Sequence, residues 1–387
     1  MGISRVPTSS SAESTIELYN RVAVEERRND TATTTAGETR AASLADLAPP
    51  VIPYCVSPFY AEQIRRSGHY DQLRYIIEPS DEESCSPGSW DTSGEHMSTI
   101  VKGLQHKYQQ TALMLVTDKC FSYCRFCFRK RFVGRVSDEV ASDYPAIGRY
   151  IAAHPEITNL LISGGDPFVL TTDQLNGILD HVLTIPHLRS IRFGTKSIVH
   201  HPARFEDPGI TAMFSRIRQA GKTPLLITHV DHFGEISELT ERVARNMIAQ
   251  GVQLLNQTVL LRRVNDQPEI LTETFRRLHC LGIRPYYLFQ ARPVRQGSHF
   301  QVPFVRGVPL VQDAQRRLGG IEKTFRFIMS HHTGKIEILD LTDDGRLYMR
   351  YHQNRDPMKV GRIFSRPCRD GDCWLDDMAT EGSLEAA

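Results

Sequence analysis

The chain has almost no excess of charge of either sign, because its 387 residues include 46 Lys and Arg against 45 Asp and Glu. A protein that attracts nucleic acid or an anionic membrane through its overall field would be more strongly basic. The sequence also lacks a run of roughly 20 apolar residues that could span a bilayer, and its N-terminus lacks the basic and then apolar order of a secretory signal. We therefore expect a cytoplasmic protein with no nucleic-acid partner and no membrane partner.

Cysteine is scarce, with eight residues in the whole chain. Three of them, Cys120, Cys124 and Cys127, fall within eight residues of sequence. The others are scattered at Cys55, Cys85, Cys280, Cys368 and Cys373. This distribution is unlike the disulfide framework of a small secreted domain, and clustered thiols in a reducing compartment more often bind metal.

Composition divides the chain into four segments. Residues 1–48 are rich in Ser, Thr and Ala and poor in large apolar groups, which predicts a mostly disordered tail. Residues 49–105 carry Pro, Ser and Gly punctuation and are expected to form an N-terminal helical extension. Residues 106–307 hold the main domain, and residues 308–387 are expected to form a small C-terminal appendage.

The main domain alternates short apolar runs, such as ALMLVT, NLLISGG and SIRFGT, with amphipathic stretches such as LNGILDHVLTI. Repeated strand and helix units of this kind build a parallel sheet. Six such strands predict an α/β fold, a partial (β/α)6 barrel, although an open doubly wound sheet would have the same strand count. In the appendage we expect a helical segment over VQDAQRRLGGIEKTFRFIMS and then a hairpin that turns at DDG.

The clustered cysteines follow directly on the first of these strands, so the three thiols project from a loop at its carboxyl end, where barrel enzymes place their chemistry. Three thiolates can hold three irons of a 4Fe–4S cubane and leave the fourth iron free for a small molecule. A structural zinc site or a ferredoxin cluster would need a fourth ligand at suitable spacing, which is not evident nearby. One strand downstream, LLISGGDP places Ser163, Gly164, Gly165 and Asp166 at the same edge.

The spacing C-x3-C-x2-C, with an aromatic residue before the last cysteine, resembles the radical S-adenosylmethionine (SAM) superfamily. The motifs TDKCFSYCRFCFRKRFVG, ISGGDP, THVDHFGEI, LLNQTVLLRRVND and IRPYYLFQ, spread over roughly residues 100–350, resemble its lysine 2,3-aminomutase family more narrowly. The resemblance implies a partial barrel of the radical SAM type with a 4Fe–4S cluster on the three cysteines, and SAM held partly by residues 163–166. It also implies pyridoxal 5'-phosphate (PLP), an external electron donor of flavodoxin or ferredoxin type, and an isomerase that moves an α-amino group to the β-carbon of an amino acid.

The same resemblance carries the PLP residues onto this chain. Lys335 in HHTGKIEIL matches the lysine that binds the PLP aldehyde. Lys107, Thr111 and Gln257 match the residues that hold the phosphate, with a hydroxyl in place of one of the family's charges. His331 and His332, beside Lys335, are further candidates for contact with the phosphate.

The substrate residues depart from the family. Arg129, two residues past the last cysteine, matches the arginine that binds the substrate carboxylate, for which its bidentate geometry is suited. The two carboxylates that hold the distal ammonium of lysine are replaced by Arg292 and Ile328. An arginine there repels lysine and attracts a carboxylate, so the substrate is expected to be an amino acid other than lysine, such as a glutamate-like one. A structural role for Arg292, paired with a nearby Asp, is the competing interpretation.

Several alternatives stay open. An enzyme of the same family could act without PLP on a small metabolite, as an epimerase, dehydrogenase or decarboxylase. The family's interfacial zinc has only a partial counterpart in Cys368 and Cys373, with Gln267 at the position of another ligand, so a metal at these cysteines and a homo-oligomeric state are both left undecided.

Overall fold

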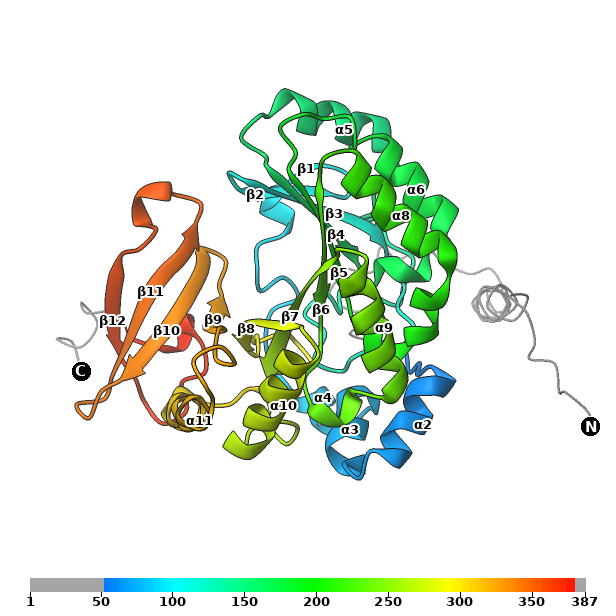
Figure 1. Ribbon diagram of the computed structural model, residues 1–387. Helices are drawn as coiled ribbons and strands as arrows, with labels where there is room; N and C mark the ends of the chain where they lie inside the picture. The colour runs from blue at the N-terminus through cyan, green and yellow to red at the C-terminus, as the bar shows by residue number, and fades with distance from the viewer. Residues whose placement is uncertain (1–51, 380–387) are drawn as a thin grey trace, which may run out of the picture. The chain divides into compact units, whose positions relative to one another are not determined.

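The computed structural model describes residues 52–379. The disordered tail expected for residues 1–48 lies outside the described residues. Within residues 52–379 all twelve strands belong to one sheet, in which each strand pairs with the next along the sequence (Figure 1). The first and the twelfth strands of this sheet are not neighbours, so the sheet is open and the expected partial barrel is confirmed.

The middle of the sheet is parallel, from β3 to β9. The six strands expected from the sequence are the first six of these, and β9 is a seventh. The parallel strands are β3 (Thr111–Thr117), β4 (Asn159–Gly164), β5 (Ser190–Thr195), β6 (Thr223–Thr228), β7 (Gln253–Leu260), β8 (Arg284–Gln290) and β9 (Arg326–Ser330). The antiparallel strands at the two ends are β1 (Thr99–Val101), β2 (Leu104–Tyr108), β10 (Gly334–Leu341), β11 (Arg346–Asn354) and β12 (Ile363–Pro367).

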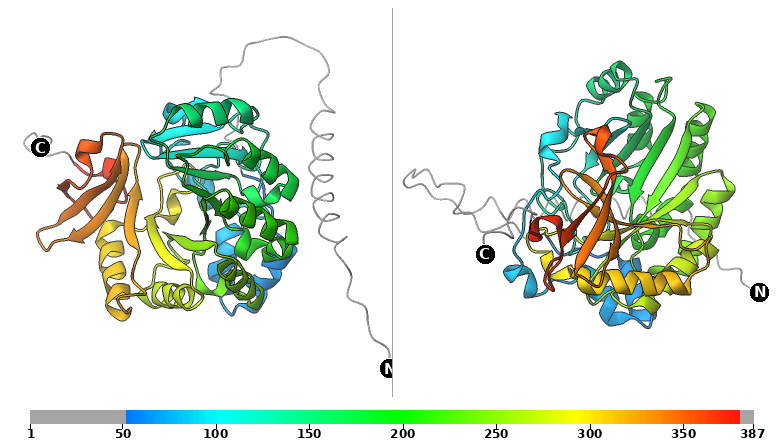
Figure 2. Two further views of the ribbon diagram at one scale, coloured as in Figure 1. Left: turned by 45° about the horizontal axis from the view of Figure 1, so that its top comes forward. Right: turned by 90° about the vertical axis from the view of Figure 1, so that its left-hand side faces the viewer.

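Helices between the parallel strands cover one face of the sheet (Figures 1 and 2). Their starts follow capping rules: Thr171 and Gln174 form a capping box before α6, and Ser237 caps α9. These helices are α5 (Tyr144–Ala153), α6 (Thr172–Asp180), α7 (Ser197–His200), α8 (Pro208–Gln219), α9 (Glu238–Ala249), α10 (Pro268–Cys280) and α11 (Phe304–Arg317). None of the helices within the described part of the chain is both long and apolar enough to cross a membrane.

Period-two alternation in the strands separates the packed face from the hollow one. On β5, Ile191 and Phe193 are fully buried in the main hydrophobic core, whereas Arg192 and Gly194 point the other way and line a cavity. Strand β7 repeats this pattern, with buried Leu254 on the packed side and Gln257 lining the cavity. The sheet therefore buries its apolar residues under the helices and turns its polar residues into a hollow interior.

The appendage corrects one expectation. The segment expected to be helical through FRFIMS ends its helix, α11, at Arg317, and residues 326–330 form β9. Gly319 and Gly320 separate the two elements, and glycines there interrupt helical propensity. The expected hairpin is confirmed as β10 and β11, whose turn contains Gly345 at φ 76°.

The N-terminal extension contains α2 (Pro58–Arg66), α3 (Tyr70–Ile77) and α4 (Glu82–Cys85). It packs on the loops that follow the carboxyl ends of the parallel strands. The hydroxyl of Tyr60 donates a hydrogen bond to Oε1 of Glu235 at 2.7 Å, and Nε2 of Gln63 donates to the carbonyl of Gly234 at 2.8 Å. The backbone amide of Arg125, inside the cysteine loop, donates to the carbonyl of Ile76 at 2.7 Å.

Candidate active site

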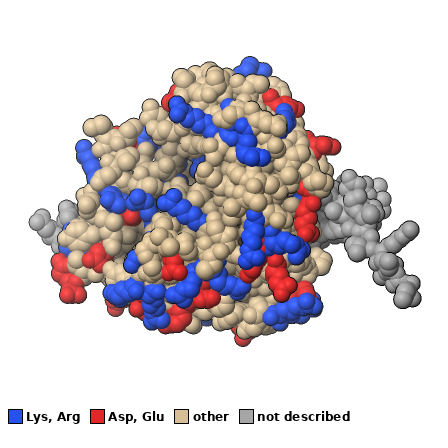
Figure 3. Space-filling view, in the orientation of Figure 1, with Lys and Arg blue, Asp and Glu red and all other residues tan. Residues whose placement is uncertain are grey.

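A cavity of about 350 Å³ lies inside the open barrel and gathers most of the site residues that the sequence singled out. These lining residues are Cys120, Cys124, Cys127, Arg129, Ser163, Gly164, Gly165, Asp166, Lys107, Thr111, Gln257, Arg292 and Lys335. His331 and His332, the further candidates for contact with the phosphate, do not line it. Figure 3 shows the molecule hollowed on the face seen there, with Lys and Arg side chains around the hollow. Residues that are far apart in the sequence, such as Lys107 and Lys335, thus line one cavity.

The three thiols of the cysteine loop are enclosed, and burial raises the pKa of Cys120, Cys124 and Cys127. A buried thiolate needs a cation to be stable, and bound iron is such a cation. Among residues 52–379, these three sulfurs do not gather within 4.8 Å of one another, as the ligands of a single zinc ion would. Three thiolates that each bind a different iron need no such convergence, so the residues fit a 4Fe–4S cluster.

A buried ionic group braces the cysteine loop from the N-terminal extension. Nε and Nη2 of Arg125 donate to the two carboxylate oxygens of Glu83, at 2.7 and 2.6 Å, and Nζ of Lys130 donates to the same carboxylate at 3.3 Å. Burial alone raises the pKa of Glu83, but the two cations outweigh it and lower the pKa. Glu83 lies on α4, so a residue of the extension helps to fix the loop that carries the thiols.

The glycine pair after β4 is required by close approach of the backbone. A Cβ on Gly165 would lie 2.2 Å from the carbonyl oxygen of Lys119, and one on Gly164 would lie 2.3 Å from that of Thr117. Gly164 also has φ 130°, which L side chains rarely adopt. The pair therefore lets the end of β4 lie against the segment that leads into the cysteine loop, to which the amides of Gly165 and Asp166 donate hydrogen bonds.

Asp166 serves mainly to hold the neighbouring loops. Its carboxylate accepts hydrogen bonds from Oγ1 of Thr195, at 2.8 and 2.9 Å, and from the amides of Lys196 and Ser197, at 2.8 and 2.9 Å. Burial raises its pKa in spite of these donors. The SGGD motif thus connects the carboxyl ends of β3, β4 and β5 through hydrogen bonds.

Lys335, at the start of β10, has the surroundings of a nucleophilic amine. Its Nζ donates to Oε1 of Gln353, a neutral acceptor, at 3.0 Å, and lies over the rings of Tyr108 and Tyr287. Burial, together with the positive charges of neighbouring side chains such as Arg192, lowers the pKa of Lys335 to about 7. A large fraction of this lysine is therefore a free amine near neutral pH, as attack on an aldehyde requires.

The residues expected to hold the PLP phosphate lie in the same cavity. Nζ of Lys107 donates to the carbonyls of Ser93 and His331, at 3.1 and 3.0 Å, and burial lowers the pKa of Lys107 to about 8. The hydroxyl of Thr111 donates to Oδ1 of Asn159 at 3.1 Å. Gln257 faces the cavity from β7.

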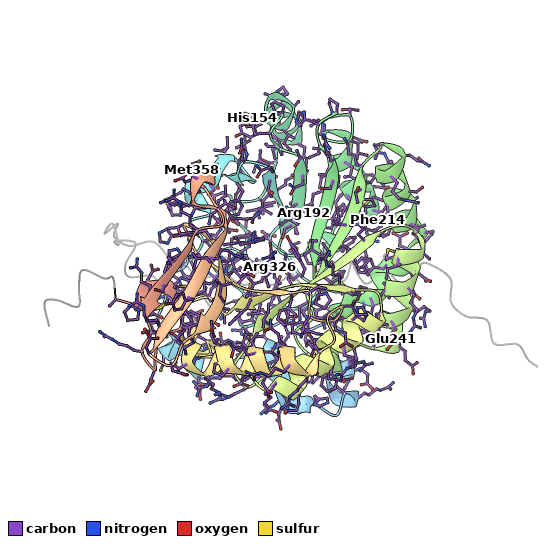
Figure 4. The ribbon with its side chains drawn as sticks, turned by 60° about the vertical axis from the view of Figure 1, so that its left-hand side comes forward. His154, Arg192, Phe214, Glu241, Arg326 and Met358 are labelled. Atoms are coloured by element: carbon purple, nitrogen blue, oxygen red, sulfur yellow. The ribbon has the colours of Figure 1, made fainter. Side chains whose placement is uncertain are left out.

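Arg192 adds a charge that the sequence analysis missed. It lines the cavity from β5, and its buried Nε has no hydrogen-bond partner. Figure 4, in which the C-terminal strands come forward, labels Arg192 near the centre of the view. An unpartnered guanidinium in an enclosed space is suited to an anion such as a phosphate, so the cavity residues fit PLP. The signal was present as a lone arginine within an apolar strand, IRF.

Arg129, expected to bind the substrate carboxylate, is itself paired. Its Nη2 and Nε donate to Oε1 of Glu95 at 2.8 and 3.2 Å, and its Nη1 donates to Oγ of Ser163 and to the carbonyl of Gly164, both at 3.1 Å. Burial raises the pKa of Glu95, but Arg129 and Arg131 lower it to about 2. Glu95 is thus a charged cavity residue that the sequence analysis did not identify.

Arg292 lies where the sequence predicts, on the cavity wall. Its Nη2 donates to Oγ of Ser330 at 3.0 Å, its guanidinium lies 4.0 Å from the centroid of the Phe128 ring, and its buried Nη1 has no partner. No ion pair of Arg292 with an Asp occurs among the described residues, so the competing structural role lacks support. Ile328 is fully buried and does not line the cavity, whereas Ser330 on the same strand does.

A further charged group lies beside the cysteine loop. Nζ of Lys196 is buried between Oδ2 of Asp231 and Oε1 of Glu235, at 2.9 and 2.8 Å, and its positive charge opposes the rise in the pKa of Cys124. Both acids belong to the motif THVDHFGEI, which entered the sequence analysis only as a family resemblance. Outside the cavity, Sγ of Cys368 and Sγ of Cys373 each donate to backbone carbonyls.

Comparison with known proteins gives clear relatives. A protein of Aquifex aeolicus (strain VF5), which carries a provisional L-lysine 2,3-aminomutase name, is 37% identical over 321 residues, covering 82% of this chain and 86% of that protein. The L-lysine 2,3-aminomutase of Escherichia coli (strain K12) is 33% identical over 230 residues, which cover 59% of this chain and 66% of that protein. That of Clostridium subterminale is 30% identical over 269 residues, which cover 68% of this chain and 63% of that protein.

Comparison with family models and with solved structures gives less similarity. Among models of protein families, none matches the chain. A solved radical SAM methyltransferase from Sphaerobacter thermophilus aligns with a TM-score of 0.38 and 18% identity, covering 58% of this chain and 68% of that one. A coproporphyrinogen III oxidase from Escherichia coli, described as a radical SAM enzyme, aligns with a TM-score of 0.34 and 12% identity, covering 64% and 68% of the two chains.

Proposed function

The chain belongs to the lysine 2,3-aminomutase family of radical SAM enzymes, and we propose that it is a PLP-dependent isomerase that moves the α-amino group of an amino acid to the β-carbon. The carrying observation is the half-buried Lys335, which lines the same cavity as the three clustered thiols. A lysine with a lowered pKa and an iron-binding loop in one enclosed space is what such chemistry requires.

The cysteine loop would hold the 4Fe–4S cluster through Cys120, Cys124 and Cys127, with SAM against the glycine pair at the end of β4. When bound and reduced, the cluster and SAM together supply a carbon radical that can abstract an unactivated hydrogen. The residues of the chain fix the walls of this space. Glu83 and Arg125 hold the loop, and Asp166 joins it to the neighbouring strands.

The PLP group would join the chain at Nζ of Lys335, whose pKa is lowered by burial and by the neighbouring cations, so that it is partly deprotonated. Its phosphate would lie among Lys107, Thr111, Gln257 and Arg192. Arg192 supplies the second positive charge that the hydroxyl of Thr111 does not, which removes the main reason to prefer an enzyme of this family that works without PLP.

The substrate would be an amino acid with an acidic side chain, rather than lysine. Six Lys and Arg side chains line the cavity against two acidic ones, Glu95 and Asp166, and both acids already accept hydrogen bonds from cavity residues. Arg292 offers its unpartnered Nη1 to the distal carboxylate. The α-carboxylate would bind to Arg129. Its Nη1 now donates to two neutral acceptors, the hydroxyl of Ser163 and the carbonyl of Gly164, which a charged carboxylate can displace because it is a stronger acceptor.

Borohydride reduction tests the PLP step directly. Protein purified without oxygen, with its cluster reconstituted, is incubated with PLP and reduced, and peptides are then examined by mass spectrometry. We expect a pyridoxyl group on Lys335, its loss in Lys335→Arg, and its retention in the control Lys323→Arg, which alters an exposed lysine. A cluster-loaded protein that cleaves SAM but forms no adduct at Lys335 would contradict the aminomutase proposal while leaving the radical SAM assignment intact.

A further inference from the structure

We propose that His331, His332 and Asp376 form a binding site for a divalent transition-metal ion that fastens the C-terminal segment to the wall of the active-site cavity. Each residue offers one ligand atom, and these atoms all lie within 4.8 Å of one another. Within residues 52–379, this is the one group of three or more His, Cys, Asp or Glu side chains that converges so closely. None of the three residues lines the cavity, so the site is separate from the active site.

His331 contacts both Asp376 and Thr333, and its Nδ1 can also accept a hydrogen bond of 3.3 Å from the backbone amide of Thr333 when the ring proton is on Nε2. Its Nε2 lies 3.0 and 3.2 Å from the two carboxylate oxygens of Asp376, and its Nδ1 lies 2.8 Å from Oγ1 of Thr333. A metal-binding histidine usually donates its second ring N–H to such an oxygen, which fixes the tautomer. With the proton on Nδ1, the lone pair of Nε2 faces the carboxylate oxygens of Asp376, so two acceptors lie opposite each other. A cation bound between them would interact favourably with both.

The same pair can also exist as an ordinary hydrogen bond with the proton on Nε2. Ion binding then displaces that proton to solvent, so metal and proton compete for one position. Adjacent ligands that each lie about 2.0–2.2 Å from a zinc ion are separated by distances of this order.

The composition of the site indicates the class of ion. Two imidazoles and one carboxylate favour Zn²⁺ or another first-row divalent ion, whereas Mg²⁺ and Ca²⁺ prefer all-oxygen sites. The ring of His332 lies 3.9 Å from that of His331, and both His332 and Asp376 are exposed. Solvent can therefore deliver the ion and complete its coordination with water.

The position of the site gives the ion a structural task. Asp376 follows the buried Trp374, whose ring lies 6.2 Å from that of His331. On the other side, the carbonyl of His331 accepts a hydrogen bond from Nζ of Lys107, and β10 with Lys335 begins at Gly334. An ion at this point would hold residues 374–378 against the turn at residues 331–333. That turn contacts Lys107 on one side and leads into the strand of Lys335 on the other.

Metal content of the whole chain tests the proposal, which does not rest on the proposed function. In a Cys120→Ala, Cys124→Ala, Cys127→Ala background, which removes the cluster ligands, protein is exposed to Zn²⁺, desalted and analysed by mass spectrometry for metal. We expect about one zinc per chain, lost in His332→Ala and in Asp376→Asn. The control Asp370→Asn, an exposed aspartate of the same segment, should keep the zinc.

Substitution with Co²⁺ identifies the ligands. We expect visible absorption of a nitrogen and oxygen site without the intense near-ultraviolet band of a thiolate ligand, and the spectrum should be lost in His332→Ala. Circular dichroism confirms that the two variants fold, because both residues are exposed. Zinc content that is equal in all variants would overturn the proposal. So would zinc that is lost in Cys368→Ala, Cys373→Ala and kept in Asp376→Asn, because the ion would then sit on the C-terminal thiols.

Discussion

The amino group of Lys335 lies 3.0 Å from the amide oxygen of Gln353, its partner across the β10–β11 hairpin. Because this partner is neutral, it does not stabilise the ammonium form as a carboxylate would, and the pKa of Lys335 stays low, at about 7. Because only the free amine attacks an aldehyde, we expect the rate of PLP attachment to rise with pH, to reach half of its maximum near pH 7 and to level off above it. Stopped-flow absorbance over a pH series measures this profile.

Replacement of Gln353 by Glu tests the cause. A carboxylate at this distance stabilises the ammonium form, so the midpoint should move to higher pH by roughly 1–3 units. The neutral control Gln353→Met should keep the midpoint low. A midpoint near the ordinary lysine pKa in the natural chain would show that Lys335 is not buried among cations.

Reversal of the charge at Arg292 is expected to change the choice of substrate. Arg292→Glu removes the unpartnered Nη1 and puts a carboxylate in a desolvated wall, which repels an acidic side chain and attracts a basic one. The ratio of kcat/KM for glutamate to that for lysine should fall by roughly tenfold or more. β-Amino acid formation with glutamate, aspartate, lysine and arginine gives the measurement.

Ser330→Ala is the matched control, since it removes only the hydroxyl that accepts a hydrogen bond from Nη2 of Arg292. It should change the ratio much less than the charge reversal does. Preferential turnover of lysine by the natural chain would refute the inferred role of Arg292.

Loss of the buried carboxylate behind the cysteine loop should weaken both the fold and the cluster. Glu83→Gln leaves Arg125 and Lys130 buried without their counter-charge, which costs about 3–5 kcal/mol when one partner of a buried pair is removed. Urea unfolding measures the loss, and iron content after reconstitution should fall with it.

The neighbouring Glu82→Gln provides the comparison. Its carboxylate pairs with the half-exposed Arg263 and should affect unfolding by less than about 1 kcal/mol. Equal effects of the two substitutions would mean that the buried ionic group does not brace the loop.

The parts of the structure that follow local rules were predictable. Short apolar runs separated by amphipathic stretches identified β3 to β8, and the position of the three cysteines directly after the first run placed the site at the end of β3. Strand β9 was missed because RFIMS, in which Phe327, Ile328, Met329 and Ser330 are all buried, was read as the end of the helical segment before it. A strand that is covered on both faces cannot be told from a buried helix by periodicity alone.

The pairings inside the cavity could not be predicted. Glu95 meets Arg129, and Glu83 meets Arg125, only because the segment before β1 folds over the loop after β3. Such contacts depend on tertiary geometry, and a lone acid in a polar segment gives no sign of it. Arg192 was visible in the sequence, but only the hollow face of β5 turns it from a surface charge into a cavity residue.

The hydrogen bond from Lys107 to the carbonyl of His331 joins the second strand of the open sheet to the turn after the ninth. It therefore crosses the gap that the twelve strands leave open. During synthesis on a ribosome, the cysteine loop emerges well before the turn at His331 and the strand with Lys335. A nascent chain therefore exposes its three thiols before it has synthesised the part of the cavity wall that carries Lys335.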